Sequence, residues 1–179
     1  MPGRPTHSPA SSTYRDVGTE RHPASGPRQL ALPTPERIAV VEWPQVAPDG
    51  HRPGSPYVHA VWLGALGPSA TLAWERLARQ AGAAPGSEVD CADLARSLGL
   101  GDGLGPNAPL SRSLARMVAF GAATRPSEGV LAVRLALPDA SARQLARLSR
   151  SANLAHQRWG QGTWPSATAP DPASPELVR

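Results

Sequence analysis

The chain has 179 residues, of which 21 are proline and 17 are glycine, and most prolines fall in residues 1–56 and 160–179. About 100 residues remain between these segments, enough for one modest hydrophobic core. The basic residues number 18, every one an arginine, against 14 acidic residues, and the net charge of +4 mildly favours an anionic partner.

No targeting or membrane-spanning segment is expected. The N-terminal sequence MPGRPTHSPA has no apolar run of the kind found in a secretory signal. The longest apolar stretch, Tyr57 to Leu66, is too short to cross a bilayer and contains His59. The single cysteine, Cys91, excludes an internal disulfide and fits a reducing cytosol. We therefore expect a cytoplasmic protein that does not contact a membrane.

The first 54 residues are predicted to be a disordered or loosely docked arm. Residues 1–35 are polar, proline-rich and mixed in charge, so they cannot bury enough apolar surface to offset chain entropy. Ile38–Val41 is a brief β-like run, either a docked arm or a short edge strand. Residues 44–56 are expected to be a linker. The folded domain is then expected to span residues 55–160, and residues 161–179 to form a disordered tail.

Two helices are expected next. Ser55 and Pro56 suit the cap and the first position of a helix whose apolar residues continue to Ala65. Gly67-Pro68 ends that helix. A second helix covers Ser69–Ala81, with Glu75, Arg76 and Arg79 on its polar side.

A short strand, a capped helix and a long loop follow. Ser87–Val89 is predicted to be the strand, and Asp90 the N-cap of a helix over Cys91–Leu98. Gly99 is a suitable C-cap. The loop from Gly99 to Ala108 is rich in glycine but lacks the G-x-G-x-x-G phosphate-binding pattern, so a flexible loop is the better interpretation.

The next helix has one apolar and one polar face. Asn107 is expected to cap it, and Pro109 fits its first turn. The inner face is predicted to hold Leu110, Leu114, Met117, Val118 and Gly121. The outer face is predicted to hold Arg112, Ala115, Arg116 and Ala119, with Ser111 and Ser113 beside it.

A hairpin and a last helix complete the domain. Ala122–Thr124 and Val130–Leu137 flank the turn Arg125–Gly129, and Arg134 lies on the less apolar face of the second strand. The last helix is predicted over Ala140–Trp159. Its apolar stripe comprises Leu145, Leu148, Ala152, Ala155 and Trp159, and its other face carries Arg143, Arg147, Arg150 and Arg158.

Charge is unevenly divided within the domain. Residues 110–159 contain eight arginines and two acids, whereas residues 57–109 contain three arginines and five acids. The positive charge is therefore concentrated on the helix that follows the glycine-rich loop, on the hairpin and on the last helix.

The order of these elements resembles the winged helix–turn–helix superfamily of bacterial transcription regulators. In that likeness, which covers about 70 residues, the supporting helix is Cys91–Leu98 and the recognition helix Asn107–Phe120. Ser69–Ala81 is the first core helix, Val89 lies in the short strand, and Ala122–Leu137 is the wing. The fold class expected is mainly α with a small β-hairpin wing, an α+β winged helix–turn–helix.

The resemblance implies a sequence-reading protein that binds double-stranded DNA. A helix fits the major groove, where arginine is the commonest reader of guanine, and a basic hairpin can lie along phosphate. The implied DNA contacts are Ser111, Arg112, Ser113, Arg116, Arg125 and Arg134, with Arg143, Arg147 and Arg150 as phosphate or partner contacts. The alternative is a winged-helix adapter or structural component that does not bind DNA and that contacts a protein through the apolar first helix or the arginine-bearing last helix.

A homodimer through the helices at residues 57–66 and 140–159 is also expected, because both carry more apolar residues than a three-helix core needs.

Trp62, Trp74 and Trp159 are expected in the core, although a stacking platform for bases is the alternative. Cys91 is expected to be inert. No paired carboxylates, nucleophile motif or metal-ligand spacing is present, so we expect neither catalysis, nor a metal, nor a cofactor.

Overall fold

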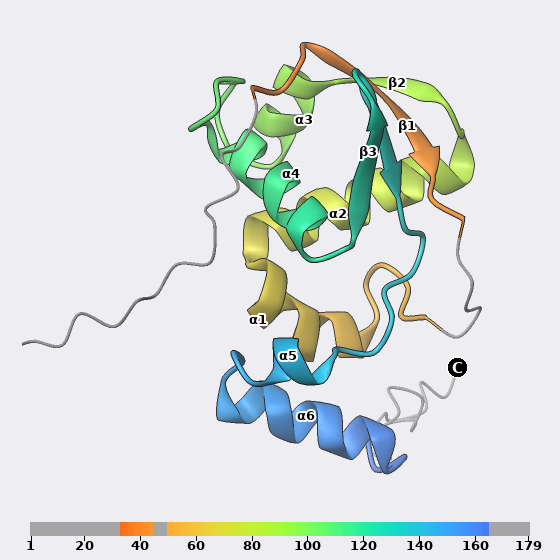
Figure 1. Cartoon of the computed structure of the whole chain (residues 1–179), viewed down its shortest axis with the longest axis vertical. Coiled ribbons are helices and arrows are strands. Elements are labelled where there is room, and N and C mark those ends of the chain that lie inside the picture. The colour runs from red at the N-terminus through yellow and green to blue at the C-terminus, as the bar shows by residue number, and fades with distance from the viewer. Residues whose placement is uncertain (1–32, 45–49, 165–179) are drawn as a thin grey trace, which may run out of the picture.

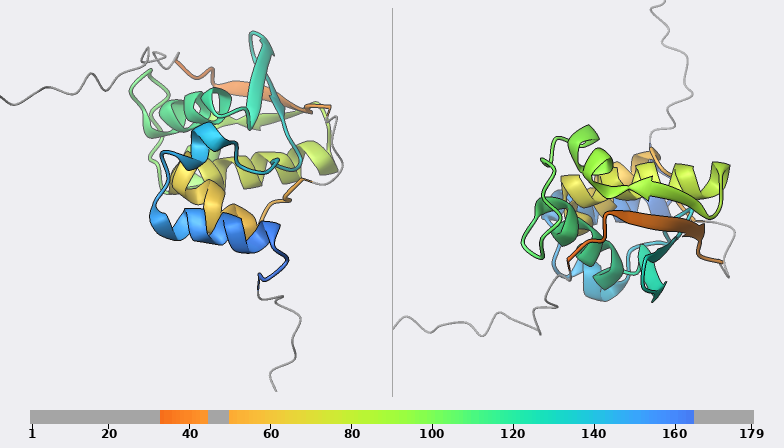
Figure 2. Two further views of the ribbon diagram at one scale, coloured as in Figure 1. Left: turned by 60° about the horizontal axis from the view of Figure 1, so that its bottom comes forward. Right: turned by 90° about the horizontal axis from the view of Figure 1, so that it is seen from above.

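The computed structural model describes residues 33–44 and 50–164, and most of the tails expected at residues 1–35 and 161–179 lies outside this part of the chain. Within it the chain forms a mixed α/β fold in three layers: a sheet, then α2 and α4, then α1 and α6 (Figures 1 and 2). The strands are β1 (Arg37–Glu42), β2 (Ser87–Asp90), β3 (Ala123–Ser127) and β4 (Val130–Val133). The helices are a π-helical turn (Val58–Trp62), α1 (Leu63–Leu66), α2 (Pro68–Ala83), α3 (Cys91–Ser97), α4 (Pro109–Ala119), α5 (Ala142–Leu145) and α6 (Arg150–Gly160).

Strand β1 lies inside the sheet, whose order is β2-β1-β4-β3. It pairs antiparallel with β2 and parallel with β4, and Val40 lies opposite Leu131. Ile38 and Val40 are buried because they face the helical layer. The expected loose arm or edge strand is therefore an interior strand, and a domain start at residue 55 falls too late. The strands that pair with β1 lie some 50 and 90 residues later, so the residues around β1 do not reveal this pairing.

The second layer holds the centre of the hydrophobic core. The indole N–H groups of the fully buried Trp62 and Trp74 donate to the carbonyl oxygens of Pro138 and Arg134, each at 2.9 Å. Both side chains are core residues, as predicted. Gly67 takes a φ of 78° between α1 and α2, a conformation that residues with a side chain rarely adopt.

Glu75 differs from its prediction because it is buried. Its carboxylate accepts from the Gly54 N–H at 2.9 Å and pairs with His59 Nε2 at 3.0 Å and Arg79 at 3.4 Å. The segment before the π-helical turn folds back over α2 at this point and covers the carboxylate. A buried carboxylate is stable only with such partners.

The cap of α3 is confirmed, whereas that of α4 is not. The Asp90 carboxylate accepts from the Asp93 N–H at 2.8 Å, and Gly99 has a φ of 69° just after the helix. Asn107 does not cap α4, because Ala108 occupies the N-cap position and offers no side-chain acceptor.

The hairpin turn is shorter than expected, and two helices replace the single last helix that was predicted. Strand β3 continues through Ser127, so the turn consists of Glu128 and Gly129 alone. The single helix predicted over Ala140–Trp159 is two helices, because Ser141 and Ser149 each cap a new start.

The two helices expected to form a dimer contact instead pack on each other within one chain. Tyr57, Val58, Val61 and Trp62 are buried, and α6 lies against them with Ala152 facing inward. This packing buries most of their apolar residues, whereas Leu63 and Leu154 remain exposed. In the part of the chain that the structure describes, no helix is long and apolar enough to span a bilayer.

Candidate functional site

The outer face of α4 carries one arginine free of protein partners. Arg112 is exposed and makes no hydrogen bond or ion pair with any described residue. Ala119 beside it is also exposed, and Ala115 is half-buried. The solvent-facing side of α4 therefore carries small side chains and two exposed arginines, Arg112 and Arg116.

Arg116 lies one turn further along but is held by the protein. Its Nε and Nη2 atoms donate to the carbonyl oxygen of Ala65, at 3.0 and 2.6 Å. Its guanidinium also lies 5.3 Å from the centre of the Phe120 ring. Arg116 thus joins α4 to the end of α1, a contact that the sequence did not predict.

Ser111 and Ser113 were predicted beside the outer face, yet both are buried, with 0% and 6% of their surface exposed. The Ser111 hydroxyl donates to Leu104 O at 3.1 Å and lies 2.8 Å from Thr34 Oγ1. Since Ser111 has one hydroxyl hydrogen, Thr34 is the donor between the two. Ser113 donates to Pro109 O within α4. Neither serine is placed to touch DNA.

The arginines of the hairpin also face the protein. Arg134 donates from Nε to Gly121 O at 2.9 Å, and its guanidinium stacks 4.2 Å from the centre of the Trp43 ring. Arg125 is half-buried and lines a groove beside α4. The sequence predicted both residues as phosphate contacts of the wing and did not predict these positions.

Further unpaired arginines lie on α5 and α6. Arg143, Arg147, Arg150 and Arg158 are exposed and have no hydrogen-bond or ion-pair partner among the described residues. Helices α1, α4, α5 and α6 contain no acidic residue. By contrast, the ion pairs of Arg37, Arg79 and Arg96 all involve acids of α2, β2 and α3.

The structure brings α5 close to α4 by way of α1. Arg116 of α4 contacts Ala65, and Leu148, just after α5, lies against the neighbouring Gly64, where an added methyl group would be 3.2 Å from it. Figure 1 shows α1 between α4 and α5, so the two helices are not direct neighbours. Arg112 of α4, Arg143 of α5 and Arg147 just after α5 are exposed and together are called here the arginine face; α4 and α5 contain no acidic residue.

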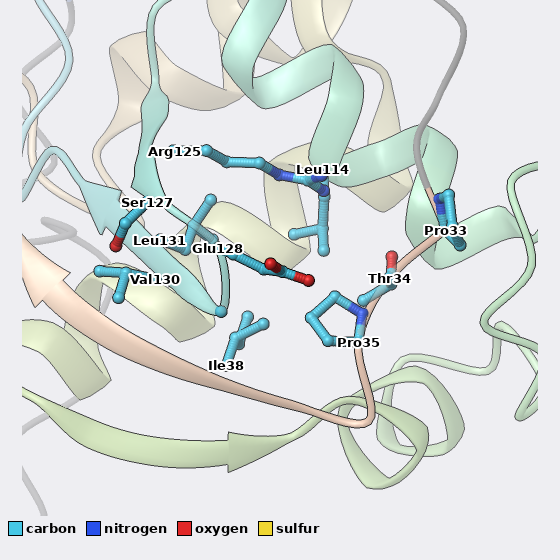
Figure 3. Close-up of a pocket in the computed structure, with 11 residues that line it drawn as sticks. Pro33, Thr34, Pro35, Ile38, Leu114, Arg125, Ser127, Glu128, Val130 and Leu131 are labelled. Atoms are coloured by element: carbon cyan, nitrogen blue, oxygen red, sulfur yellow. The ribbon is translucent and has the colours of Figure 1, made fainter.

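A groove that the sequence analysis missed lies between the N-terminal segment, α4 and the hairpin (Figure 3). Its volume is about 650 Å³. Its walls come from three stretches far apart in the chain: Pro33–Pro35 with Ile38, then Leu114, then Arg125 and Ser127–Leu131. No local pattern could have predicted it, because residues on opposite walls are some 75 to 95 positions apart.

A polar and aromatic cluster joins α6 to the core. The Tyr57 hydroxyl accepts from the Ala140 N–H at 2.9 Å and lies 2.8 Å from His156 Nδ1. His51 stacks on the Tyr57 ring at 3.7 Å, and its Nε2 pairs with Asp139 at 2.8 Å. Burial raises the pKa of Tyr57, partly opposed by the hydrogen bond from Ala140. The cluster fastens α6 and opens onto no cavity identified among the described residues.

Cys91 lies at the start of α3 and is fully buried. Burial and the adjacent Asp90 raise the pKa of its thiol to about 11, although Arg125 lowers it in part. The thiolate, which is the nucleophilic form, is therefore scarce at neutral pH. No three His, Cys, Asp or Glu side chains of residues 33–44 and 50–164 are placed to hold a metal ion.

No protein-family model, curated protein or solved structure matches this chain.

Proposed function

We propose that this protein is a cytoplasmic winged-helix protein that binds double-stranded DNA through the arginine face, as a bacterial transcriptional regulator does. The observation that carries the proposal is that Arg112 of α4, Arg143 of α5 and Arg147 just after α5 are exposed and unpaired, on helices without an acidic residue. Exposed positive charge without protein partners is what a polyanion-binding surface requires.

The order of elements supports the same proposal. The series α2, β2, α3, α4 and the β3–β4 hairpin is that of a winged helix–turn–helix, with α4 in the place of the recognition helix and the hairpin as wing. Strand β1 departs from the expected pattern by lying between β2 and β4. It stiffens the sheet that carries the hairpin and leaves the outer side of α4 exposed.

The contacts now proposed differ from those expected from the sequence. Arg112 projects from the small-residue face of α4, which suits close approach to a groove of the duplex. Arg143 of α5 and Arg147 just after it would meet phosphate, which positions the protein without reading sequence. The tip of the hairpin carries Glu128, so we assign the hairpin no phosphate contact.

The test is binding to labelled duplexes, measured by fluorescence anisotropy at two salt concentrations. The protein is first mixed with a pool of random genomic fragments, and the duplex that it prefers is selected from this pool. The selected duplex is then used to compare the variants. The parent protein should lose affinity steeply as salt rises, because phosphate contacts release counterions. Arg112→Ala should bind the preferred duplex more weakly by roughly 5- to 150-fold, the range of one bidentate base contact.

Arg76→Ala is the matched control for Arg112→Ala. Arg76 is exposed on α2 and has no hydrogen-bond or ion-pair partner among the described residues, so the same charge is lost away from the arginine face. The Arg76→Ala variant should bind DNA with the same affinity as the parent protein. If the parent binds no duplex at low salt, or both variants bind alike, the DNA proposal is wrong.

A winged-helix adapter that binds protein is the second candidate. The groove beside the hairpin favours it, because Pro33, Pro35 and Val130 line it with apolar surface over the buried side chains of Ile38, Leu114 and Leu131. An apolar interface gives a complex whose affinity changes little with salt and whose binding heat capacity is negative. The same salt series therefore separates the two candidates.

A further inference from the structure

The groove between the N-terminal segment, α4 and the hairpin has the size and lining of a small-molecule site. Its volume of about 650 Å³ falls within the range of roughly 300–1,000 Å³ that is typical of ligand pockets. Pro33, Pro35 and Val130 form its accessible apolar surface, and the buried side chains of Ile38, Leu114 and Leu131 lie beneath it (Figure 3). A mostly apolar cavity with a few charged groups binds a ligand that has an apolar body and matching charges.

The walls of this groove are held in place before any ligand binds. Thr34 fixes the N-terminal wall, because its backbone N–H donates to Leu104 O at 2.9 Å and its hydroxyl bonds to Ser111. On the other side, Gly129 accepts from the Ala39 N–H at 2.8 Å and ties the hairpin turn to β1. A site whose walls are already ordered loses little entropy on binding.

Two opposite charges from the hairpin line the groove without pairing. Arg125 and Glu128 form no ion pair with each other or with any other described residue. The Arg125 side chain runs along the groove towards Leu114, and the Glu128 carboxylate points across it towards Pro35 (Figure 3). Arg125 is half-buried, so its guanidinium has lost part of its hydration without gaining a counter-ion. A ligand that supplies the missing carboxylate would be favoured here.

We propose that this groove binds a free α-amino acid with a large apolar side chain. Its carboxylate pairs with Arg125, its ammonium group pairs with Glu128, and its side chain packs between Leu114 and Leu131. A zwitterion fits better than a simple fatty acid, because Glu128 would repel a second carboxylate that has no ammonium group beside it. The inference goes beyond DNA binding and does not depend on it.

The experiment is a titration of the full chain, labelled with ¹⁵N and followed by NMR. Leucine and phenylalanine are the probes, and N-acetyl-leucine and leucinamide each lack one of the two charges. Saturable shifts of amides around the groove, such as those of Leu114 and Gly129, are expected with both amino acids. Each single-charge probe should bind at least tenfold more weakly. Absence of saturable shifts at millimolar leucine, or equal binding of all probes, overturns the proposal.

Two variants test the charges separately. Arg125→Gln and Glu128→Gln should each weaken leucine binding at least tenfold, while the amide spectrum stays dispersed. Glu128 is exposed in the turn, so its variant tests the site even if Arg125→Gln proves unstable. Arg76→Gln, on α2 outside the groove, should bind leucine as the parent does. Unchanged affinity in Glu128→Gln overturns the assigned contact. Because no DNA is present, failure here leaves the arginine face untouched.

Discussion

Arg116 donates two hydrogen bonds from its guanidinium to the carbonyl oxygen of Ala65. Ala65 lies in the last turn of α1, where carbonyl oxygens have no partner within the helix. One of the two arginines that the sequence predicted to read bases is thus a link between two helices. Its role can be separated from that of Arg112, which lies one turn away without a partner.

Replacing Arg116 with alanine should destabilise the protein. A hydrogen bond to a charged donor contributes roughly 1.5–3 kcal/mol when buried, and partial exposure lowers this, so we expect a loss of about 1 kcal/mol. Urea unfolding measures it. Arg112→Ala is the control and should stay within roughly 0.5 kcal/mol of the parent. Equal stability of the two variants would show that the bond to Ala65 is not stabilising.

The arginines of α5 should act through phosphate alone. Replacing both Arg143 and Arg147 with alanine should weaken binding to every duplex by a similar factor and lower the salt slope by about two, since each phosphate contact contributes roughly one. Preference among sequences should not change. Binding constants at four or more salt concentrations provide the slope, and a slope equal to the parent's would exclude α5 from the interface.

Tyr57→Phe should loosen α6. The substitution leaves the Ala140 N–H without its acceptor and removes the bond to His156, so a loss of about 1–3 kcal/mol is expected. Urea unfolding is the measurement, with Gln157→Ala as control because Gln157 is exposed on α6. A loss no larger than that of the control would mean that the hydroxyl does not fasten the helix.

Stability should fall at alkaline pH because of Cys91. The thiol has an ordinary pKa of 9.0 and a folded-state pKa of about 11, so folding favours its protonated form. This contribution is complete below pH 9 and is lost as the pH rises through about 11. A shift of two units corresponds to about 3 kcal/mol.

The comparison is with Cys91→Ser, whose hydroxyl does not titrate in this range. The variant should lose less stability than the parent between pH 8 and pH 11, as measured by urea unfolding at fixed pH values. Tyr57 also has a raised pKa and contributes in the same direction in both proteins. Parallel pH curves for parent and variant would exclude Cys91 as a source of the alkaline loss.

Limited proteolysis should leave a fragment that begins before Arg37. Strand β1 is hydrogen-bonded on both sides, and Thr34 is buried against α4, so cleavage between residues 37 and 42 requires the sheet to open. Mass spectrometry of the protected fragment identifies its start. A stable fragment that begins at residue 50 or later would contradict the interior position of β1.

The sequence by itself determined the features that depend on near neighbours. Asp90 as the cap of α3, Gly67 as the break before α2, and the inner face of α4 with Leu110, Leu114 and Met117 all follow from spacings of a few residues. Caps and helical periodicity act within one or two turns, so the information needed to recognise them is local.

Only the tertiary structure decided which arginines are free and where β1 lies. Arg116 and Ala65 are 51 positions apart, and Thr34 and Ser111 are 77 apart, so neither contact is visible in a local pattern. In the sequence, Arg112 and Arg116 are equivalent residues on one helix face. The end of α1 lies next to one of them and not the other, because the packing of the whole core places it there.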